Sequence, residues 1–461
     1  MAINSATTSI AFSAHSLGST VAVGRGWRMP SSHSGVGVSP LATAAKMKRR
    51  VLYIQYTNPG GYPPLEHSSR ILAERGWEVR FLGVGALGGA DVLEFPPHPS
   101  IEVRKWRYCP PGTRQKLHFL AYGLWALWTT LTWRPDWVYA SDPMSCPAAL
   151  ALSFVPGVRL LYHEHDSPEP ASGAGGRHAS DHAWARDGDH AGRGGVEGGP
   201  EVSRFWRFVL WSRTRVARRA DLCVLPNEER VAAFRTSTAT TREVECVWNC
   251  PARNDALEAR PGRGPQSLRL FYHGSIVPRR QLVAVIEGMA RAGVPSELSV
   301  AGYETSGSTG HLEQLNTEAE RRGLAARLRL LGPIQRCRLI GLCAEADAGL
   351  ALMPMRCLDL NERAMVGASN KSFDYLAAGV ALLVSDLPPW RGTFVGPGYG
   401  LACDPDDPES VAAALRWFAE HPEETRDMGE RGRQRILAEW NYEAEFGPVL
   451  ARLEGGRRSG R

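Results

Sequence analysis

The sequence predicts an α/β protein with two domains, each organised around a mostly parallel β-sheet. Three observations support this prediction. At 461 residues, the chain is too long for one typical hydrophobic core. Short apolar runs alternate with longer helical patterns in both halves of the chain. Glycine-rich and polar segments follow several of the apolar runs, and the carboxyl ends of parallel strands are where open α/β sheets bind ligands.

Composition narrows the possible functions. A hydrophobic fraction of 43% and a charged fraction of 22% are ordinary for a soluble globular protein. The net charge of +6 permits an anionic substrate or lipid surface and gives no reason to expect nucleic acid. Nine cysteines without a CxxC pair argue against a secreted disulfide framework. We therefore expect a cytoplasmic protein, either free or peripheral at the inner face of the membrane. Cys246 and Cys250 lie close together, but no second pair at zinc spacing follows, so no metal site is expected.

The first 46 residues contain no Asp or Glu and are rich in Ser, Ala, Thr and Gly. This composition resembles a transit peptide, although arginines are few and amphipathic order is slight. We expect a disordered extension, or a start codon assigned too early with Met47 as the working start.

Residues 370–386 combine several structural and polar signals. A short helix is predicted before Gly379, which suits the left-handed position after a helix, and the apolar run 380–384 suits a buried parallel strand. Asp374, in the first turn of the helix, is able to accept hydrogen bonds from a sugar diol. Lys371 and the amides at the helix start suit an anion.

Upstream segments place this stretch within a repeating β/α pattern. A strand at 268–272 leads into His273-Gly274-Ser275 and then Pro278-Arg279-Arg280. Further strands, alternating with helices, are predicted at 298–301, 328–331 and 348–352. These landmarks, in this order, resemble the C-terminal domain of the retaining GT-B glycosyltransferases of the family-4 type, also called glycosyltransferase group 1. The resemblance covers residues 268–442 and is looser in the N-terminal half.

The resemblance implies the GT-B fold, in which two Rossmann-like domains with parallel sheets face each other across a cleft. Residues 47–250 would form the acceptor domain, with a low-complexity insert at 167–200. Residues 251–439 would form the nucleotide-sugar donor domain, and residues 440–461 a helix that crosses back, followed by a tail.

The resemblance also implies an activity. Such an enzyme transfers a sugar from a nucleotide-diphosphate sugar to a glycan, lipid or small-molecule acceptor, with retention of configuration. It needs no metal or cofactor, because basic side chains and helix N-termini neutralise the diphosphate leaving group. Two alternatives stay open, namely an inactive nucleotide-sugar-binding or scaffold protein and a GT-B-fold sugar-nucleotide epimerase.

This sequence matches the residue types at only some of the family's donor-binding positions. Arg280 falls where the family has a phosphate-binding lysine, and Asp374 falls where it has an acidic ribose contact. Ser275 replaces an arginine that many members keep, and Val366 replaces the first acidic residue of the family's Glu-x7-Glu motif. The remaining candidates for the donor site are Gly274, Arg279, Asn370 and Lys371.

The first half begins like a Rossmann-like βαβ unit. A strand at 50–57 and a helix at 64–75 flank a loop that contains Gly60 and Gly61. This loop is not a GxGxxG fingerprint, so a dinucleotide site is weakly supported. The resemblance places Gly60 and Gly61 against the donor diphosphate or the acceptor.

Two histidines follow the strand predicted at 159–162. The resemblance makes His165 the catalytic candidate that contacts the donor sugar, with His163 as the alternative. From the residues alone, the pair could also be loop residues at a strand end or, because of the His-x-His spacing, metal ligands.

Two further segments carry alternative interpretations. The apolar, aromatic run 117–131 is short for a bilayer span of about 20 residues. It suits a core helix, or an interfacial helix that would give peripheral membrane association. Within the insert, Asp187-Gly188-Asp189 matches the Asp-x-Asp of metal-dependent GT-A glycosyltransferases. No predicted strand end holds this motif, so we expect no metal there.

Overall fold

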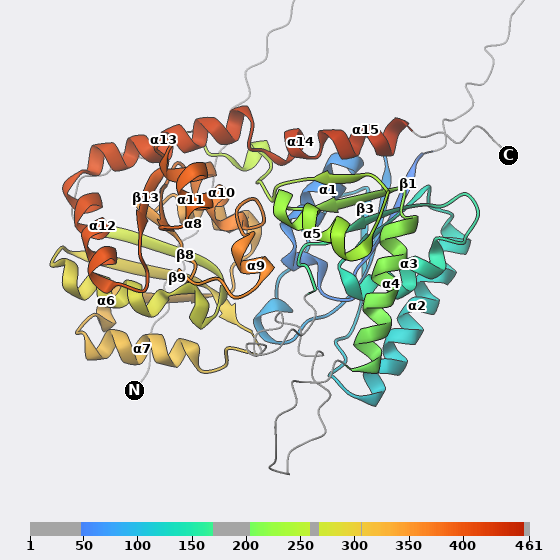
Figure 1. Ribbon diagram of the computed structural model, residues 1–461, viewed down its shortest axis with the longest axis horizontal. Helices are drawn as coiled ribbons and strands as arrows, with labels where there is room; N and C mark the ends of the chain where they lie inside the picture. The colour runs from blue at the N-terminus through green and yellow to red at the C-terminus, as the bar shows by residue number, and fades with distance from the viewer. Residues whose placement is uncertain (1–47, 169–202, 259–266, 306, 456–461) are drawn as a thin grey trace, which may run out of the picture. The chain divides into compact units, whose positions relative to one another are not determined.

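The computed structural model describes residues 48–168, 203–258, 267–305 and 307–455, all within one compact unit, Lys48–Arg461. Two parallel β-sheets with helices on both faces organise these residues (Figure 1). The predicted α/β class with two parallel sheets is thereby confirmed. The N-terminal extension, most of the low-complexity insert and Asp187-Gly188-Asp189 lie outside the described residues.

The first sheet has seven parallel strands in the order β3-β2-β1-β4-β5-β6-β7. In that order the strands are Ile101–Trp106, Glu78–Val84, Arg50–Ile54, Trp137–Ser141, Arg159–His163, Leu222–Leu225 and Val244–Cys246. The order reverses between β1 and β4. In open α/β sheets, the carboxyl ends of strands at such a reversal flank the crevice that binds ligands.

Both faces of the first sheet are covered. On one face lie α2 (Thr113–Trp133), α3 (Cys146–Leu152), α4 (Arg204–Arg219) and α5 (Glu228–Thr238), whose apolar side chains share one core with the strands. The opposite face is covered by α1 (Pro63–Glu74) together with α14 (Tyr442–Glu445) and α15 (Gly447–Gly455) from the end of the chain. No helix among the described residues is both long and apolar enough to cross a membrane.

The second sheet has six parallel strands in the order β10-β9-β8-β11-β12-β13. In that order the strands are Leu328–Gly332, Ser296–Glu304, Leu268–Ile276, Ala348–Ala351, Ala381–Ser385 and Gly400–Cys403. Here the order reverses between β8 and β11. The segments after these two strands and after β12 therefore define the second ligand-binding edge.

Helices again cover both faces of the second sheet. One face packs against α6 (Leu282–Ala292), α7 (His311–Arg321) and α12 (Pro408–Glu420). The other packs against α8 (Arg336–Cys343), α10 (Asn370–Ala377), α11 (Pro388–Trp390) and α13 (Pro422–Ala438), and a short α9 (Leu360–Arg363) precedes α10. The hydrogen-bonding side chain of Asp407 caps α12, and Gly379 with φ 69° follows α10, as expected for helix ends.

The last residues of the chain complete the core of the first sheet. Tyr442, Phe446, Val449 and Leu453 are buried in the same cluster as strand residues of β1. The indole Nε1 of Trp137, at the start of β4, donates a hydrogen bond to the Leu453 carbonyl at 3.3 Å. The final two helices are therefore part of the first domain's packing, although the second domain precedes them in sequence.

Several predicted boundaries differ from those of the structure, and three of them bear on the candidate site. Strand β1 ends at Ile54 and not at residue 57. Strand β8 continues to Ile276 instead of ending at 272, because Gly274 pairs with Gly302 of β9, where a Cβ at Gly302 would lie 1.9 Å from the Gly274 carbonyl oxygen. Helix α10 begins at Asn370 and not at the predicted residue 372, which places Asn370 and Lys371 in its first turn.

Candidate functional site

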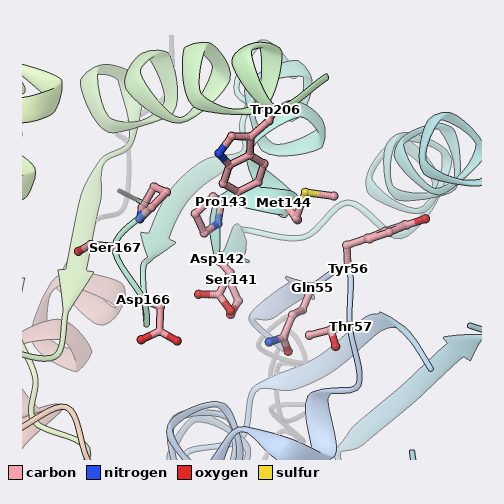
Figure 2. A pocket seen from close by; sticks show the side chains of 11 residues that line it. Gln55, Tyr56, Thr57, Ser141, Asp142, Pro143, Met144, Asp166, Ser167 and Trp206 are labelled. Atoms are coloured by element: carbon pink, nitrogen blue, oxygen red, sulfur yellow. The ribbon is translucent and has the colours of Figure 1, made fainter. Parts of the chain in front are cut away.

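A pocket opens at the carboxyl edge of the first sheet (Figure 2). Its enclosed volume is about 30 Å³, and it reaches about 490 Å³ when the open solvent at its mouth is included. Its walls come from the segments after β1, β4 and β5, and Trp206 of α4 closes one side. The lining residues are Gln55, Tyr56, Thr57, Ser141, Asp142, Pro143, Met144, Asp166, Ser167, Pro168 and Trp206. The pocket thus lies at the reversal between β1 and β4 that topology marks as a ligand site.

Several polar groups in this pocket are buried without a hydrogen-bond partner. Both side-chain amide atoms of Gln55 are in this state, as are the hydroxyl oxygens of Ser141 and Ser167. A buried polar group that makes no hydrogen bond costs about 1–3 kcal/mol, so these three side chains around one cavity are expected to bind water or a polar ligand. Asp142 has φ 64°, a left-handed conformation that costs a residue with a side chain and that often occurs at functional sites.

The rings of the two candidate histidines lie next to each other beside this pocket, tilted by 41°. The ring centroids of His163 and His165 are 3.9 Å apart, and the ring of Tyr62 lies 5.3 Å from that of His165. The backbone amide of His165 donates to the Asp142 carboxylate at 3.1 Å. The hydroxyl of Tyr139 and Nδ1 of His163 are 2.6 Å apart, and Nε2 of each of the two rings is buried without a partner. Both rings therefore have an atom left for a ligand, and the hydrogen bond with Tyr139 holds His163 within the fold.

Burial controls the charge of both rings. It lowers the pKa of His165 to about 4, with the nearby Arg230 also lowering it and Asp166 opposing the shift. Burial, followed by the neighbouring His165, lowers the pKa of His163 well below its ordinary value. Both rings are neutral at neutral pH, so either could exchange a hydrogen bond with a sugar hydroxyl but neither would supply a positive charge.

Gly60 and Gly61 lie in the short turn Pro59–Gly61 that leads to Tyr62 and so to His165. A Cβ at Gly60 would lie 2.5 Å from the Leu93 carbonyl oxygen, whereas one at Gly61 would meet nothing closer than 3.8 Å. The glycine at position 60 is thus explained by packing against the chain. Gly61 has no such reason, and the predicted contact of the pair with donor or acceptor stays a prediction.

At the edge of the second sheet, Gly274 and Lys371 lie against each other. A Cβ at Gly274, which has φ 113°, would be 2.8 Å from Cε and 3.0 Å from Nζ of Lys371. The ammonium group also lies 5.6 Å from the centroid of the Tyr272 ring. Only glycine therefore leaves room for this cation beside β8, on the first turn of α10 whose amides suit an anion.

The predicted arginines occupy different environments. Arg279 is held by hydrogen bonds and an ion pair to Glu362. Arg280, at the end of the turn Pro278–Arg280, contacts Met353 Sδ at 2.6 Å, and its Nε is buried without a partner. Among the described residues no carboxylate pairs with Arg280. Of the two, Arg280 is better placed to take an anionic ligand, and Ser275 lies in β8 beside them without a cationic group.

Asp374 is fully buried and engaged by a residue that sequence reasoning missed. Arg336, at the start of α8, donates to both carboxylate oxygens of Asp374 at 2.7 Å and lies 3.4 Å from Asp255. Burial raises the pKa of Asp374, and the Arg336 guanidinium opposes that shift. His273 Nε2 is 3.5 Å from the same carboxylate. A ribose contact by Asp374 stays a prediction and would require the ligand to share this carboxylate with Arg336.

Val366, the departure from the family's acidic motif, belongs to the hydrophobic core. Its side chain is buried in the cluster that contains Phe373 and Trp248. Its backbone carbonyl accepts a hydrogen bond from Asn227 of the first domain. A glutamate would place an unpaired charge in this cluster, so the valine fits the packing observed.

An ionic cluster at the start of α1 meets Arg336. Glu66 pairs with Arg70 at 3.0 Å, and His67 Nε2 lies 3.9 Å from the Asp255 carboxylate that Arg336 also approaches. Burial raises the pKa of Glu66 and lowers that of His67. The sequence signal for Arg336 was its place after the Gly332 end of a strand, but its partners are too distant in sequence to have been predicted.

Two family models match the chain. A glycosyl transferase 4-like domain matches residues 65–250, and a glycosyl transferase-like domain matches residues 295–451. Among curated proteins, a glycogen synthase of Mycobacterium tuberculosis is 23% identical over 323 residues, which cover 69% of this chain and 68% of that protein.

Solved structures show the same fold. A sucrose-phosphate synthase from Thermosynechococcus elongatus has a TM-score of 0.61 and 16% identity, covering 88% of this chain and 100% of the other. Anabaena Alr3699/HepE in complex with UDP and glucose has a TM-score of 0.63 and 14% identity, with the same coverage. These neighbours have the two parallel-sheet domains of the GT-B fold. Together with the family models, they show that the chain is a GT-B glycosyltransferase belonging to the family-4, or group 1, glycosyltransferases.

Proposed function

We propose that the protein transfers a sugar from a nucleotide-diphosphate sugar to a hydroxyl group of a glycan, lipid or small-molecule acceptor, with retention of configuration and without a metal ion or cofactor. The observation that carries this proposal is the pair of cations, Arg280 and Lys371, at the carboxyl edge of the second sheet. Charges of this kind suit a diphosphate leaving group. HepE, which shares the fold, was solved with UDP and with UDP-glucose, which supports this class of donor.

The transfer requires few chemical groups from the protein. The bond from the anomeric carbon to the diphosphate oxygen breaks, and a bond from that carbon to the acceptor oxygen forms on the same face of the sugar. The acceptor's proton passes to an oxygen of the leaving diphosphate. Arg280 and Lys371 would stabilise the charge that develops on the leaving group. Neutral His165 would hydrogen-bond the donor sugar through its available Nε2, an interaction that strengthens as the bond breaks.

We propose the pocket at the edge of the first sheet as the acceptor site. The unpartnered groups of Gln55, Ser141 and Ser167 would exchange hydrogen bonds with hydroxyl groups, and the Trp206 ring offers an apolar wall for a sugar or similar ring. His165 is fixed to the wall of this pocket through its hydrogen bond to Asp142.

The acceptor site can be tested by replacing Gln55 with leucine. Because the amide makes no hydrogen bond within the protein, Gln55→Leu should leave the free energy of unfolding unchanged or raise it. Loss of one ligand hydrogen bond of about 0.5–1.5 kcal/mol should raise the acceptor KM roughly two- to tenfold, with unchanged donor affinity. An unchanged KM, or a shift in donor affinity alone, would remove Gln55 from the acceptor site.

The activity itself is tested by incubating the protein with a panel of nucleotide-diphosphate sugars and hydroxylated acceptors. We expect release of the nucleoside diphosphate in a chelator-containing buffer and a glycoside whose anomeric configuration, read by NMR, equals that of the donor. Binding without release would favour the inactive nucleotide-sugar-binding or scaffold protein, and conversion of the donor into an isomeric sugar nucleotide would favour an epimerase.

We also propose that the protein works in a reducing compartment such as the cytoplasm. All nine cysteines are free thiols, and five of them are buried, namely Cys146, Cys223, Cys250, Cys343 and Cys403. Disulfides persist mainly in oxidising compartments, so a set of thiols without any disulfide supports this proposal. Fractionation of cells that express the full chain would test it, and secretion to the medium would contradict it.

A further inference from the structure

The large apolar side chains that remain exposed gather on helices of the first domain. On α2, five of them follow one helical stripe, with spacings of three or four residues, and each is more than half exposed: Leu117, Leu120, Leu124, Trp128 and Leu131. On α4, Phe208 and Trp211 are 49% and 45% exposed, and Phe154, just after α3, is 64% exposed. A protein surface that faces only water rarely keeps so many large apolar groups together.

The two helices form one surface, which we call the α2–α4 face. They lie on the same side of the first sheet (Figure 1), and the rings of Phe119 and Phe205 join them in an edge-to-face contact with centroids 5.2 Å apart. The rings of Phe208 and Trp211 stack at 6.0 Å. The stripes are therefore rigid features of packed helices, and both present their apolar residues away from the core that they cover.

The charges of the α2–α4 face all have the same sign. Neither Thr113–Trp133 nor Arg204–Arg219 contains an Asp or Glu. The exposed cations of the two helices are Arg114, Lys116, Arg204, Arg207, Arg215, Arg218 and Arg219. Two of them lie over the exposed rings, since the guanidinium of Arg215 is 3.9 Å from the Trp211 ring and that of Arg219 is 4.0 Å from the Phe154 ring.

We propose that the α2–α4 face docks on the surface of a membrane that contains anionic lipids. Leucines and tryptophans would enter the boundary between headgroups and acyl chains, where tryptophan is favoured, and the arginines would meet the phosphates. The uniform positive charge selects this occupant, because anionic headgroups attract each nearby Lys or Arg by about 1 kcal/mol. A second copy of the chain would bring the same cations against these cations.

The α2–α4 face lies next to the proposed acceptor pocket, so docking would bring the pocket close to the membrane. Trp206 lines the proposed acceptor pocket and belongs to α4, whose next turn carries Phe208 and Trp211. A membrane in contact with α4 would therefore lie beside the pocket, so an acceptor anchored in the lipid could reach it. This consequence rests on the proposed function, whereas the docking itself does not.

The test is flotation of the full chain with vesicles, without any sugar donor or acceptor. We expect the protein to float with vesicles of phosphatidylcholine and phosphatidylglycerol, and to float less with phosphatidylcholine alone or at high salt. Leu124→Glu should lower the partition coefficient about tenfold or more, since it removes part of the roughly 1.5–3 kcal/mol gained by burying a leucine. Arg207→Glu should lower it at least about fivefold, from about 1 kcal/mol per basic residue.

Matched variants lie on the second domain. Leu358 is 53% exposed and Arg327 is also exposed, so Leu358→Glu and Arg327→Glu should bind vesicles like the unchanged protein. Absence of flotation with anionic vesicles, or equal flotation of Leu124→Glu and Leu358→Glu, would overturn the proposal. The proposal would also be overturned if the unchanged protein bound no vesicles but formed a concentration-dependent dimer that Leu124→Glu dissociates. Loss of glycosyl transfer with intact flotation would contradict only the proposed function.

Discussion

The carboxyl edge of the first sheet presents uncharged and acidic polar groups, whereas the corresponding edge of the second sheet presents cations. Gln55, Ser141 and a neutral His165 surround the first, while Arg280, Lys371 and the Arg336–Asp374 pair surround the second. The two sheets follow the same topological rule, with a reversal of strand order at the centre of each. The same architecture thus offers one edge suited to hydroxyl groups and another suited to phosphate, and the chemistry depends on the residues that follow each strand.

The largest expected effect concerns the ion pair at the second edge. Asp374→Asn leaves the buried Arg336 guanidinium with the Asp255 carboxylate, 3.4 Å away, as its remaining ion-pair partner, and breaking a buried pair in this way costs up to about 3–5 kcal/mol. Urea unfolding should show a loss of this size. The matched variant Asp386→Asn, in an exposed pair with Arg391, should lose about 0–1 kcal/mol. Equal losses would mean that the buried pair has no special role in the second domain.

Asp374 also carries the predicted ribose contact, which the same protein samples can test. Calorimetry with UDP and with inorganic pyrophosphate separates the ribose from the phosphates. If the ribose contact exists, a folded Asp374→Asn sample should lose affinity for UDP and keep its affinity for pyrophosphate. Parallel losses for both ligands would assign Asp374 to structure alone.

At the first edge, His165→Ala should lower kcat by roughly 10²-fold or more with little change in donor affinity, as expected for a positioned catalytic side chain. His163→Ala should instead lower thermal stability, because that ring is held by Tyr139, and should affect turnover less. Steady-state kinetics and thermal unfolding on both variants distinguish the roles. Normal turnover in the His165 variant, or a larger kinetic defect in the His163 variant, would reverse the assignment.

The two neighbouring arginines of the second edge allow a smaller, internally controlled comparison. Arg280→Ala should weaken donor binding by about 1.5–3 kcal/mol, the range for a hydrogen bond to a charged group. Arg279→Ala should change donor affinity less, because Glu362 already holds that guanidinium. Titration calorimetry with the donor measures both. A greater loss of donor affinity for Arg279→Ala would show that the Arg279–Glu362 ion pair opens on binding. Arg279, and not Arg280, would then be the main phosphate contact.

The last prediction concerns the dependence of stability on pH between about 4 and 6.5. Because the pKa of His165 is lowered from 6.5 to about 4, its neutral form is favoured by the fold. Its contribution to stability is therefore fully present above pH 6.5 and is lost as the pH falls through about 4. The free energy of unfolding of His165→Gln should fall less steeply than that of the unchanged protein between these values. A steeper fall in the variant would show that the ring is charged in the fold.

Much of the fold could be predicted from local patterns. The β-rich run before Asp386 and the glycine after α10 locate β12 and its preceding helix without any tertiary information. The histidines at and after the end of β5 and the arginines after β8 could be predicted because parallel sheets bind ligands at the carboxyl ends of their strands. The activity class came from the order of these landmarks and is confirmed by the family models.

The rest depended on contacts between distant parts of the chain. Arg336 and Asp374 are separated by 38 residues, so their pairing could not be read from either segment. The glycine at position 60 packs against the Leu93 carbonyl, a contact that the sequence does not reveal, and its predicted contact with a ligand stays a prediction. Similarly, the extra length of β8 depends on Gly302 of a neighbouring strand. In each case the sequence showed the residue type, but the contact that explains it involves a segment that is distant in sequence.

The burial of Tyr442, Phe446, Val449 and Leu453 in the first domain has a consequence for biosynthesis. As the ribosome extends the chain, the strands of the first sheet and α1 emerge early, but one face of that sheet lacks the cover of α14 and α15 until these helices have been made. Apolar surface on this face of the first sheet therefore stays exposed while the whole second domain is synthesised. Domains whose contacts are this distant in sequence fold slowly and are exposed to aggregation. Completion of the first domain is thus coupled to synthesis of the second domain.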